Sequence, residues 1–301
     1  MRAVIITALP IECQEVRAHM FHLHPESHPE GSVYWSGFFP CESCRWDVKV
    51  AEIGSGNTET ALETERAISY FKPHVALFVG VAGGLKDVDI GDVVVAEEIY
   101  SYESGKASDT FLPRPKMKTP TRRMLQWARI TIASRDWVQR IKGRTSECNL
   151  KALVGPVAAG EKVLSSMRSK IYTFLCEQYS SAVAVEMEGY GFLQAIHANQ
   201  NINAIVIRGI SDLIEGKYEA DAANSQELAS RHASAFAFEM LSKLGSDKHF
   251  LATVAKTKPS KKTSQERQTM VKYSVTNSGQ MAVGPNSHVT VFNNGPQSKD
   301  E

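Results

Sequence analysis

Ala184-Val185-Glu186-Met187-Glu188-Gly189 is followed further along the chain by Val206-Ile207-Arg208-Gly209-Ile210-Ser211-Asp212. In each stretch an apolar, β-branched run ends in acidic residues. Desolvating an ion is costly unless it is paired, so carboxylates rarely serve stability at the end of a buried strand. Strand ends in α/β sheets are, however, where ligands bind. We therefore predict that the two stretches form the floor of an active site.

The composition of the 301-residue chain predicts a soluble, cytoplasmic protein. Hydrophobic residues make up 43% and charged residues 22%, and the net charge is +1, so no nucleic acid or membrane partner is expected. No apolar run approaches the length of about 18 residues typical of a transmembrane helix, and no signal peptide is recognised. The five cysteines show no framework spacing and predict reduced thiols.

Segments with strand-like patterns alternate with segments at helical spacing over most of the chain. The expected strands are 2–7, 33–39, 46–53, 75–81, 92–100, 153–159, 183–185 and 204–210, and the expected helices are 10–20, 57–71, 124–141, 164–179, 189–199 and 219–244. This alternation predicts an α/β fold, a three-layer α/β/α arrangement with a central mixed, mostly parallel twisted sheet. Residues 101–118 are polar and contain prolines, which favours a long loop over a site.

The composition changes after Gly245, and the chain is therefore expected to consist of three parts. Residues 1–245 are expected to form the catalytic domain. Residues 246–269 are basic and polar and predict a linker. Residues 270–301 form a short β-rich tail, too small to hold a core alone, which favours assembly or partner binding. The alternative is a disordered tail with fortuitous β propensity.

Three acidic positions each follow an apolar strand: Glu12, the pair Glu186 and Glu188, and Asp212. If the strands are neighbours, their carboxyl ends bring these side chains around one pocket together with the glycine-rich turn 80–84. Carboxylates in different environments allow one to act as a general acid and another as a general base. Alternatively, Glu12 and Glu188 are ordinary first-turn helix residues that interact favourably with the helix dipole.

Four motifs, in order and at appropriate intervals, resemble one family. They are Ala8-Leu9-Pro10-Ile11-Glu12, Gly80-Val81-Ala82-Gly83-Gly84, Ala184-Val185-Glu186-Met187-Glu188 and Arg208-Gly209-Ile210-Ser211-Asp212. Together they resemble the purine nucleoside phosphorylase superfamily, most closely its methylthioadenosine/S-adenosylhomocysteine nucleosidase branch, over roughly residues 1–245. The resemblance implies cleavage of a purine N-glycosidic bond, without a metal or an organic cofactor.

The resemblance also implies roles for individual residues. Asp212 matches an aspartate that protonates N7 of the leaving base, Glu188 a glutamate that holds the ribose hydroxyls, and Glu12 a glutamate that activates water. Met187 matches a residue packed on the sugar. Arg208 matches an arginine near the catalytic acids, or it forms a structural salt bridge. The remaining expected pocket residues are Glu186, Ala82, Gly83, Val163 and Ser211, of which Glu186 is expected to have either a structural or a pocket-lining role.

The loop that carries Glu12 separates hydrolysis from phosphorolysis. Phosphorolysis needs arginines and backbone donors around inorganic phosphate, and residues 8–12 contain no arginine. Hydrolysis of an adenine nucleoside or nucleotide is therefore favoured. Two alternatives remain, a phosphate-dependent purine nucleoside phosphorylase and a non-catalytic nucleotide-sensing module that acts through the tail.

Several positions depart from the nucleosidase pattern. Val81 replaces the usual serine, and Val163 replaces a phenylalanine that often stacks on the purine. Four cations in this region could meet phosphates on the 5′ side of a nucleotide, or they are solvated loop residues. They are Lys162, Lys106, Arg114 and Lys116.

Two further features concern metal and partners. Cys41 and Cys44, preceded by His22, His24 and His28, suggest zinc, but a second well-spaced pair is missing, so no metal is predicted. We expect a homo-oligomer and a protein partner for the tail. Nucleosidase domains with such tails resemble bacterial conflict or antiphage effectors, an analogy that rests on architecture alone.

Overall fold

The chain divides into two units, Met1–Lys258 and Pro259–Glu301. The computed structural model describes residues 1–42, 44–142, 150–199, 202–214 and 224–256. The predicted β-rich tail, residues 270–301, lies outside these described residues. The fold below is therefore that of the first unit.

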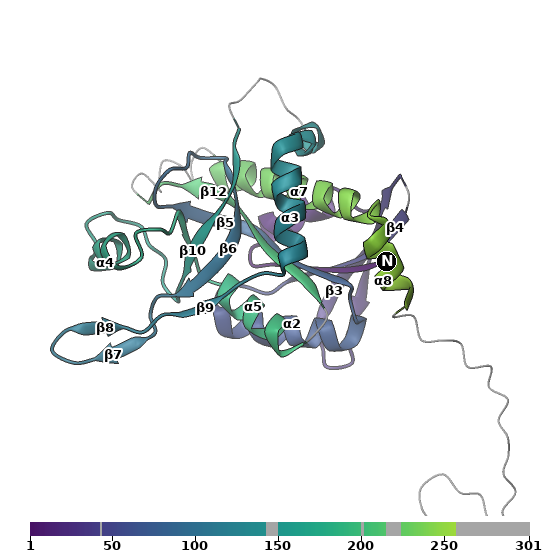
Figure 1. The fold of residues 1–301 in the computed structure, drawn as a ribbon. Coiled ribbons are helices and arrows are strands. Elements are labelled where there is room, and N and C mark those ends of the chain that lie inside the picture. Colours follow the sequence, from purple (N-terminus) through teal and green to yellow (C-terminus); the bar gives the residue numbers. More distant parts are fainter. Residues whose placement is uncertain (43, 143–149, 200–201, 215–223, 257–301) are drawn as a thin grey trace, which may run out of the picture. The chain divides into compact units, whose positions relative to one another are not determined.

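A single sheet of ten strands forms the centre of this unit (Figure 1). Its strands are β1 (Arg2–Thr7), β2 (Phe21–Ser27), β3 (Val33–Cys41), β4 (Cys44–Glu52), β5 (Val75–Gly84), β6 (Val93–Ser101), β9 (Lys116–Lys118), β10 (Ala152–Ala159), β11 (Ala184–Glu186) and β12 (Asn203–Asp212). The order is β11-β10-β6-β12-β5-β1-β4-β3-β2, with β9 on β6. Because β11 pairs with both β10 and β5, five strands close into a ring.

The sheet is mixed, as the alternation of strands and helices predicts. The neighbours β4, β1, β5 and β12 run parallel, and β6, β10 and β11 form a second parallel set. Antiparallel pairs join the two sets and form the β2–β3–β4 hairpins. The first six residues of β5 and almost all of β12 are buried, which explains why both strands are continuous apolar runs rather than alternating ones.

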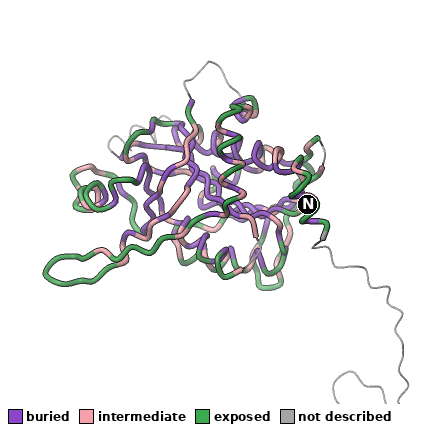
Figure 2. Tube along the Cα trace, in the orientation of Figure 1, coloured by how far each residue is buried: buried purple, intermediate pink, exposed green. Residues whose placement is uncertain are grey.

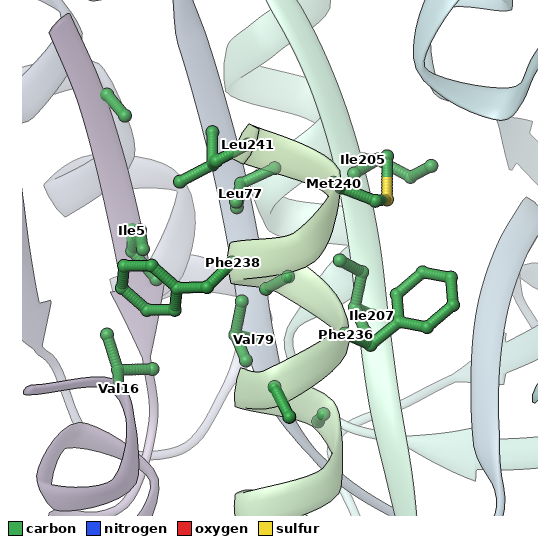
Figure 3. Packing of buried hydrophobic residues seen from close by; sticks show 14 of the residues in the cluster. Ile5, Val16, Leu77, Val79, Ile205, Ile207, Phe236, Phe238, Met240 and Leu241 are labelled. Carbon is green, nitrogen blue, oxygen red and sulfur yellow. The ribbon is translucent and has the colours of Figure 1, made fainter. Parts of the chain in front are cut away.

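Helices cover both faces of the sheet (Figures 1 and 2). On one face lie α1 (Pro10–Arg17), α3 (Arg122–Ser134) and the long α7 (Ser225–Gly245), and on the other lie α2 (Asn57–Phe71) and α5 (Gly189–Ala198). Figure 3 shows Phe236 and Phe238 of α7 packed against residues of β5, β12 and α1. Two separate apolar clusters, one on each face, confirm the predicted three-layer arrangement.

The N-terminal helix is shorter than predicted. It ends at Arg17 rather than at residue 20, and the chain then forms β2, a strand absent from the expected set. His22 and His24 therefore lie on an exposed edge strand. The weak pattern of β2 explains the error, because its residues are exposed on both faces and no alternation marks the strand.

The segment 101–118, predicted as a long loop, contains three short strands. A hairpin of β7 (Gly105–Ala107) and β8 (Phe111–Pro113) extends from the body, and β9 returns along β6 (Figure 1). The hairpin is almost entirely exposed. Backbone pairing rather than burial of apolar residues holds it, which is why the hydrophobic pattern does not reveal it.

Two predicted helices are also corrected. The helix expected at 124–141 is interrupted at Arg135, whose φ of 57° ends α3 before a short 3₁₀ helix, η1 (Asp136–Arg140). The helix expected at 164–179 begins only at α4 (Lys170–Gln178), where the Ser169 side chain accepts a hydrogen bond from the Tyr172 N–H. Such a cap marks a helix start more sharply than apolar spacing does.

The predicted linker at 246–269 begins with a helix. In α8 (Lys248–Lys256), Phe250 and Val254 are buried, and Phe250 stacks on Trp46 with ring centroids 6.0 Å apart. This burial outweighs the basic composition that favoured a linker. Among the described helices, none is long and apolar enough to span a bilayer.

The cysteine prediction is wrong for one pair. Cys41 and Cys44 form a disulfide, because the β3–β4 register places them opposite each other with Cα atoms 5.2 Å apart. This separation is typical of disulfides. The bonded sulfurs are not free thiolate ligands, and no group of three or more potential metal-binding side chains occurs among the described residues.

Candidate active site

The sheet topology brings the predicted site residues together at strand ends. Gly83 at the end of β5 pairs with both Val185 of β11 and Asp212 of β12. Beside this row lies a cavity of about 250 Å³. Its lining includes Glu12, Val81, Ala82, Gly83, Val163, Glu186, Met187, Glu188, Ser211 and Asp212. Residues from five distant parts of the sequence thus share one cavity.

Asp212 is the last residue of β12 and is 1% exposed. A register shift between Ile210 and Asp212 places the Asp212 carboxylate at the cavity. The Ser211 hydroxyl donates to Oδ2 at 3.0 Å, and the Ile214 N–H donates to Oδ1 at 3.1 Å. These bonds fix the orientation of a carboxyl group that lines the cavity.

Glu12 combines the two roles that the sequence left open. As the third residue of α1 it accepts hydrogen bonds from the N–H groups of Ala8 and Leu9 at 2.7 and 3.0 Å. Its other oxygen accepts from the Val81 N–H at 2.8 Å. Glu12 therefore caps its helix and also joins the end of β1 to the glycine-rich half of β5 at the cavity.

Glu186 and Glu188 flank Met187 before α5. Glu186 accepts from the N–H groups of Glu188 and Gly189 at 3.0 and 2.7 Å, donors that the start of a helix otherwise leaves unpaired. Glu188 accepts from the Gly56 N–H at 3.2 Å. Glu186 thus combines the structural and the pocket-lining role that the sequence left open, and both carboxylates line the cavity.

The sequence placed Arg208 among the pocket residues, but Arg208 is fully buried and does not line the cavity. It is 0% exposed and forms ion pairs with Glu186 and, at 3.0 Å, with Glu188. Its guanidinium lies 4.1 Å from the ring centroid of Phe78. The alternative of a structural salt bridge fits this position.

The buried charges shift one another's protonation. Burial raises the pKa of Glu12, although Arg208 and three backbone N–H groups partly offset this effect. Burial also raises the pKa of Glu188 to about 7, against the attraction of Arg208 and with further contributions from Glu186 and Glu12. Burial opposes the charge on Arg208, but the three glutamates raise its pKa above the ordinary value. Arg208 therefore interacts with three carboxylates, and Glu188 binds a proton at a higher pH than an ordinary glutamate does.

Gly80 explains why the second half of β5, predicted as a glycine-rich turn, is rich in glycine. A Cβ atom at this position would lie 2.4 Å from Arg208 Nη1 and 2.5 Å from Glu12 Oε1. The close approach of backbone and buried charges therefore requires glycine. Val81, which replaces the serine of the nucleosidase pattern, lines the cavity with its neighbours Ala82 and Gly83.

The predicted base-binding segment forms one wall of the cavity through Lys162, Val163 and Leu164. Val163 is 65% exposed, and Lys162 forms an ion pair with Glu103. The other predicted phosphate cations, Lys106, Arg114 and Lys116, do not line the cavity and lie in the segment of β7, β8 and β9. Of the four cations, Lys162 alone is placed to meet a ligand there.

Six lining residues were not predicted as site residues: Ala8, Leu9, Ser55, Leu164, Val185 and Gln226. Ser55 lies in the Gly54-Ser55-Gly56 turn, where two positive φ angles signal a special loop. Leu164 and Val185 are each adjacent in sequence to a predicted site residue, and the backbone N–H groups of Ala8 and Leu9 donate to Glu12. Gln226 at the start of α7 carries no sequence signal, since only packing of α7 on β12 brings it to the cavity.

Comparison with known proteins places these features in context. The family model for the phosphorylase superfamily matches residues 2–244. The ATP nucleosidase Cap17 of Escherichia coli (strain KTE188) is 29% identical over 230 residues, which cover 69% of this chain and 45% of that protein. The 5′-methylthioadenosine/S-adenosylhomocysteine nucleosidase of Staphylococcus aureus (strain JH9) is 25% identical over 185 residues, 58% of this chain and 72% of that enzyme.

A solved structure shows the same fold. The 5′-methylthioadenosine/S-adenosylhomocysteine nucleosidase of Colwellia psychrerythraea 34H, in complex with adenine, superposes with a TM-score of 0.67 and 22% identity. The match covers 81% of this chain and 96% of that enzyme.

The chain spans less than half the length of the Cap17 relative. Because the family model matches four fifths of the chain, from the first strand to the end of α7, the chain belongs to the phosphorylase superfamily.

Proposed function

We propose that the chain is an N-glycosidase that hydrolyses an adenine nucleoside or nucleotide to free adenine and the ribose moiety. The observation that carries this proposal is the meeting of Asp212, Glu12 and Glu188 around one cavity. The named relatives support the choice of base, because ATP, methylthioadenosine and adenosylhomocysteine all carry adenine.

Each carboxyl group has a step in the reaction. Asp212 delivers a proton to N7 as the bond between C1′ and N9 breaks, so that adenine leaves as a neutral molecule. Glu188 accepts hydrogen bonds from the ribose hydroxyls, which strengthen as positive charge develops on the sugar. Glu12 takes a proton from the water that adds at C1′, and its raised pKa makes it a stronger base.

The composition of the cavity wall favours water over phosphate as the nucleophile. Among its described residues the wall contains no arginine, and Lys162 is its one cation. Lys162 is also the side chain best placed to meet a 5′ phosphate, which keeps nucleotides in the proposed substrate range. A cytoplasmic, homo-oligomeric enzyme with a protein partner for residues 270–301, acting as an antiphage effector, remains a proposal from sequence and architecture.

A panel of adenine compounds tests the function. Dialysed full-length protein is incubated with ATP, AMP, adenosine and methylthioadenosine, with and without inorganic phosphate, and free adenine is measured by chromatography. We expect adenine release without phosphate. Release that requires phosphate would make the protein a phosphorylase, and no release from any compound would favour the non-catalytic module.

The Asp212→Asn variant tests the assignment of the general acid. It keeps acceptor capacity for Ser211 or Ile214 but cannot deliver the proton, so kcat is expected to fall by about 100-fold or more. Asn203→Asp, at the other end of β12, is the matched control and should retain wild-type kcat. An active Asp212→Asn variant would contradict the assignment.

A further inference from the structure

The wall of the cavity that would face the purine is the segment 160–164, named here the base loop. Under the proposed function, on which this inference rests, its position relative to the ribose-binding residues decides whether a substrate fits. The loop contains neither helix nor strand. Contacts from outside the loop therefore hold it in place.

One side chain supplies several of these contacts. The amide nitrogen Nδ2 of Asn57 donates to the Gly160 carbonyl at 3.1 Å and to Glu161 Oε1 at 3.0 Å. The Asn57 backbone N–H, at the first turn of α2, donates to Glu161 Oε2 at 3.4 Å. The carboxylate of Glu161 thus lies at the positive end of the α2 dipole, where anions are stabilised.

The same side chain also reaches the ribose side of the cavity. Its Oδ1 accepts a hydrogen bond from the Gly191 N–H at 2.8 Å, in the first turn of α5. A Cβ atom on Gly191 would lie 1.9 Å from the Asn57 carbonyl oxygen, so the two backbones are in close contact. Glu188 is the N-cap residue of the same helix. Asn57 is thereby anchored to α5, the helix whose N-cap is Glu188, the residue proposed to bind the ribose hydroxyls.

We propose that Asn57 is a positioning residue that fixes the base loop relative to the start of α5, and so sets the distance between the base-binding and ribose-binding walls. Asn57 does not line the cavity. It acts through Gly160 and Glu161 on one side and through Gly191 on the other.

The chemistry of the amide makes asparagine the suitable residue. One group must donate to the loop and accept from α5, and an amide does both. Aspartate has the same shape and still accepts from Gly191. It cannot donate to Gly160, however, and it sets a second carboxylate against Glu161, which repels the loop.

Kinetics of the full-length Asn57→Asp variant test the proposal. With ATP, AMP, adenosine and methylthioadenosine as substrates and adenine as inhibitor, we expect KM and the adenine inhibition constant to rise about 10-fold with a smaller change in kcat, since two hydrogen bonds to the loop are lost. Adding Glu161→Gln should recover most of the loss, because glutamine at 161 donates to the aspartate.

Asn203→Asp is the matched control, since Asn203 Nδ2 also donates to a backbone carbonyl, that of His74 at 3.3 Å, at the far end of β12. It should leave KM and adenine inhibition unchanged. A merely structural role for Asn57 would lower the melting temperature and the active fraction without moving KM, and that result overturns the proposal. Wild-type protein that releases no adenine from any of the four compounds overturns the proposed function and this inference together.

Discussion

At the scale of single residues, the site is a balance of buried charges. Glu12, Glu186 and Glu188 surround one fully buried arginine, and each glutamate also accepts backbone N–H groups. Removing one partner of a buried ion pair leaves an uncompensated charge, which is strongly destabilising. Arg208 thus matters for holding these three carboxylates in place, although it does not line the cavity.

The raised pKa of Glu188 predicts a specific pH dependence of stability. Because this pKa rises from 4.5 to about 7 on folding, the folded protein binds the proton more tightly between these pH values. The contribution of Glu188 to the free energy of unfolding is therefore fully present below pH 4.5 and is lost as the pH rises to about 7. The free energy of unfolding changes by up to about 3 kcal/mol over this range.

Urea unfolding of wild type and Glu188→Gln from pH 4.5 to 8 measures this effect. The difference between the two unfolding free energies should change up to pH 7 and then level off. Glu59→Gln removes an exposed carboxyl group of α2 and controls for the loss of one charge. Wild-type and Glu188→Gln curves that run parallel over the whole range would show that Glu188 does not titrate as described.

At the scale of elements, glycines set the approach of helices to the sheet. Gly209 in β12 lies against α7, where a Cβ atom would be 2.1 Å from the Ala229 carbonyl oxygen. The same helix brings Gln226 to the cavity. The packing of α7 on β12 therefore affects the shape of the cavity.

Gly209→Ala is expected to destabilise the protein by about 1–3 kcal/mol, because the obstacle is backbone that cannot rotate away. Gly155→Ala in β10 is the matched control. A Cβ atom at residue 155 would lie 2.9 Å from the Val183 side chain, which can adjust its position. The loss of stability should therefore be smaller than for Gly209→Ala. Urea midpoints of the two variants measure the difference, and equal losses would argue against the backbone contact as the cause.

At the scale of the whole molecule, the boundary of the compact unit lies beyond the predicted one. Residues 248–256 form α8, and Phe250 is 1% exposed against Trp46 and the C-terminal half of the core. The division at Lys258 follows this helix. The folded unit therefore includes a segment whose composition resembles a linker.

Two truncations test this boundary. A chain of residues 1–258 is expected to melt at the wild-type temperature, whereas a chain of residues 1–247 should melt about 5 °C lower or more. Burial of one phenylalanine contributes about 1.5–3 kcal/mol, and each kcal/mol shifts the midpoint by about 2–4 °C in a domain of this size. Equal melting of the two chains, followed by circular dichroism, would restore the boundary at Gly245.

The sequence by itself determined the family, the α/β class and the carboxylates of the site, because apolar periodicity and short motifs are local properties of the chain. Only the tertiary structure decided that Arg208 lies behind those carboxylates, that Asn57 joins α2, the base loop and α5, that β11 closes the ring onto β5, and that α8 belongs to the folded unit. Each of these depends on contacts between residues far apart in sequence. Their free energy comes from burial and pairing with partners that no local pattern identifies.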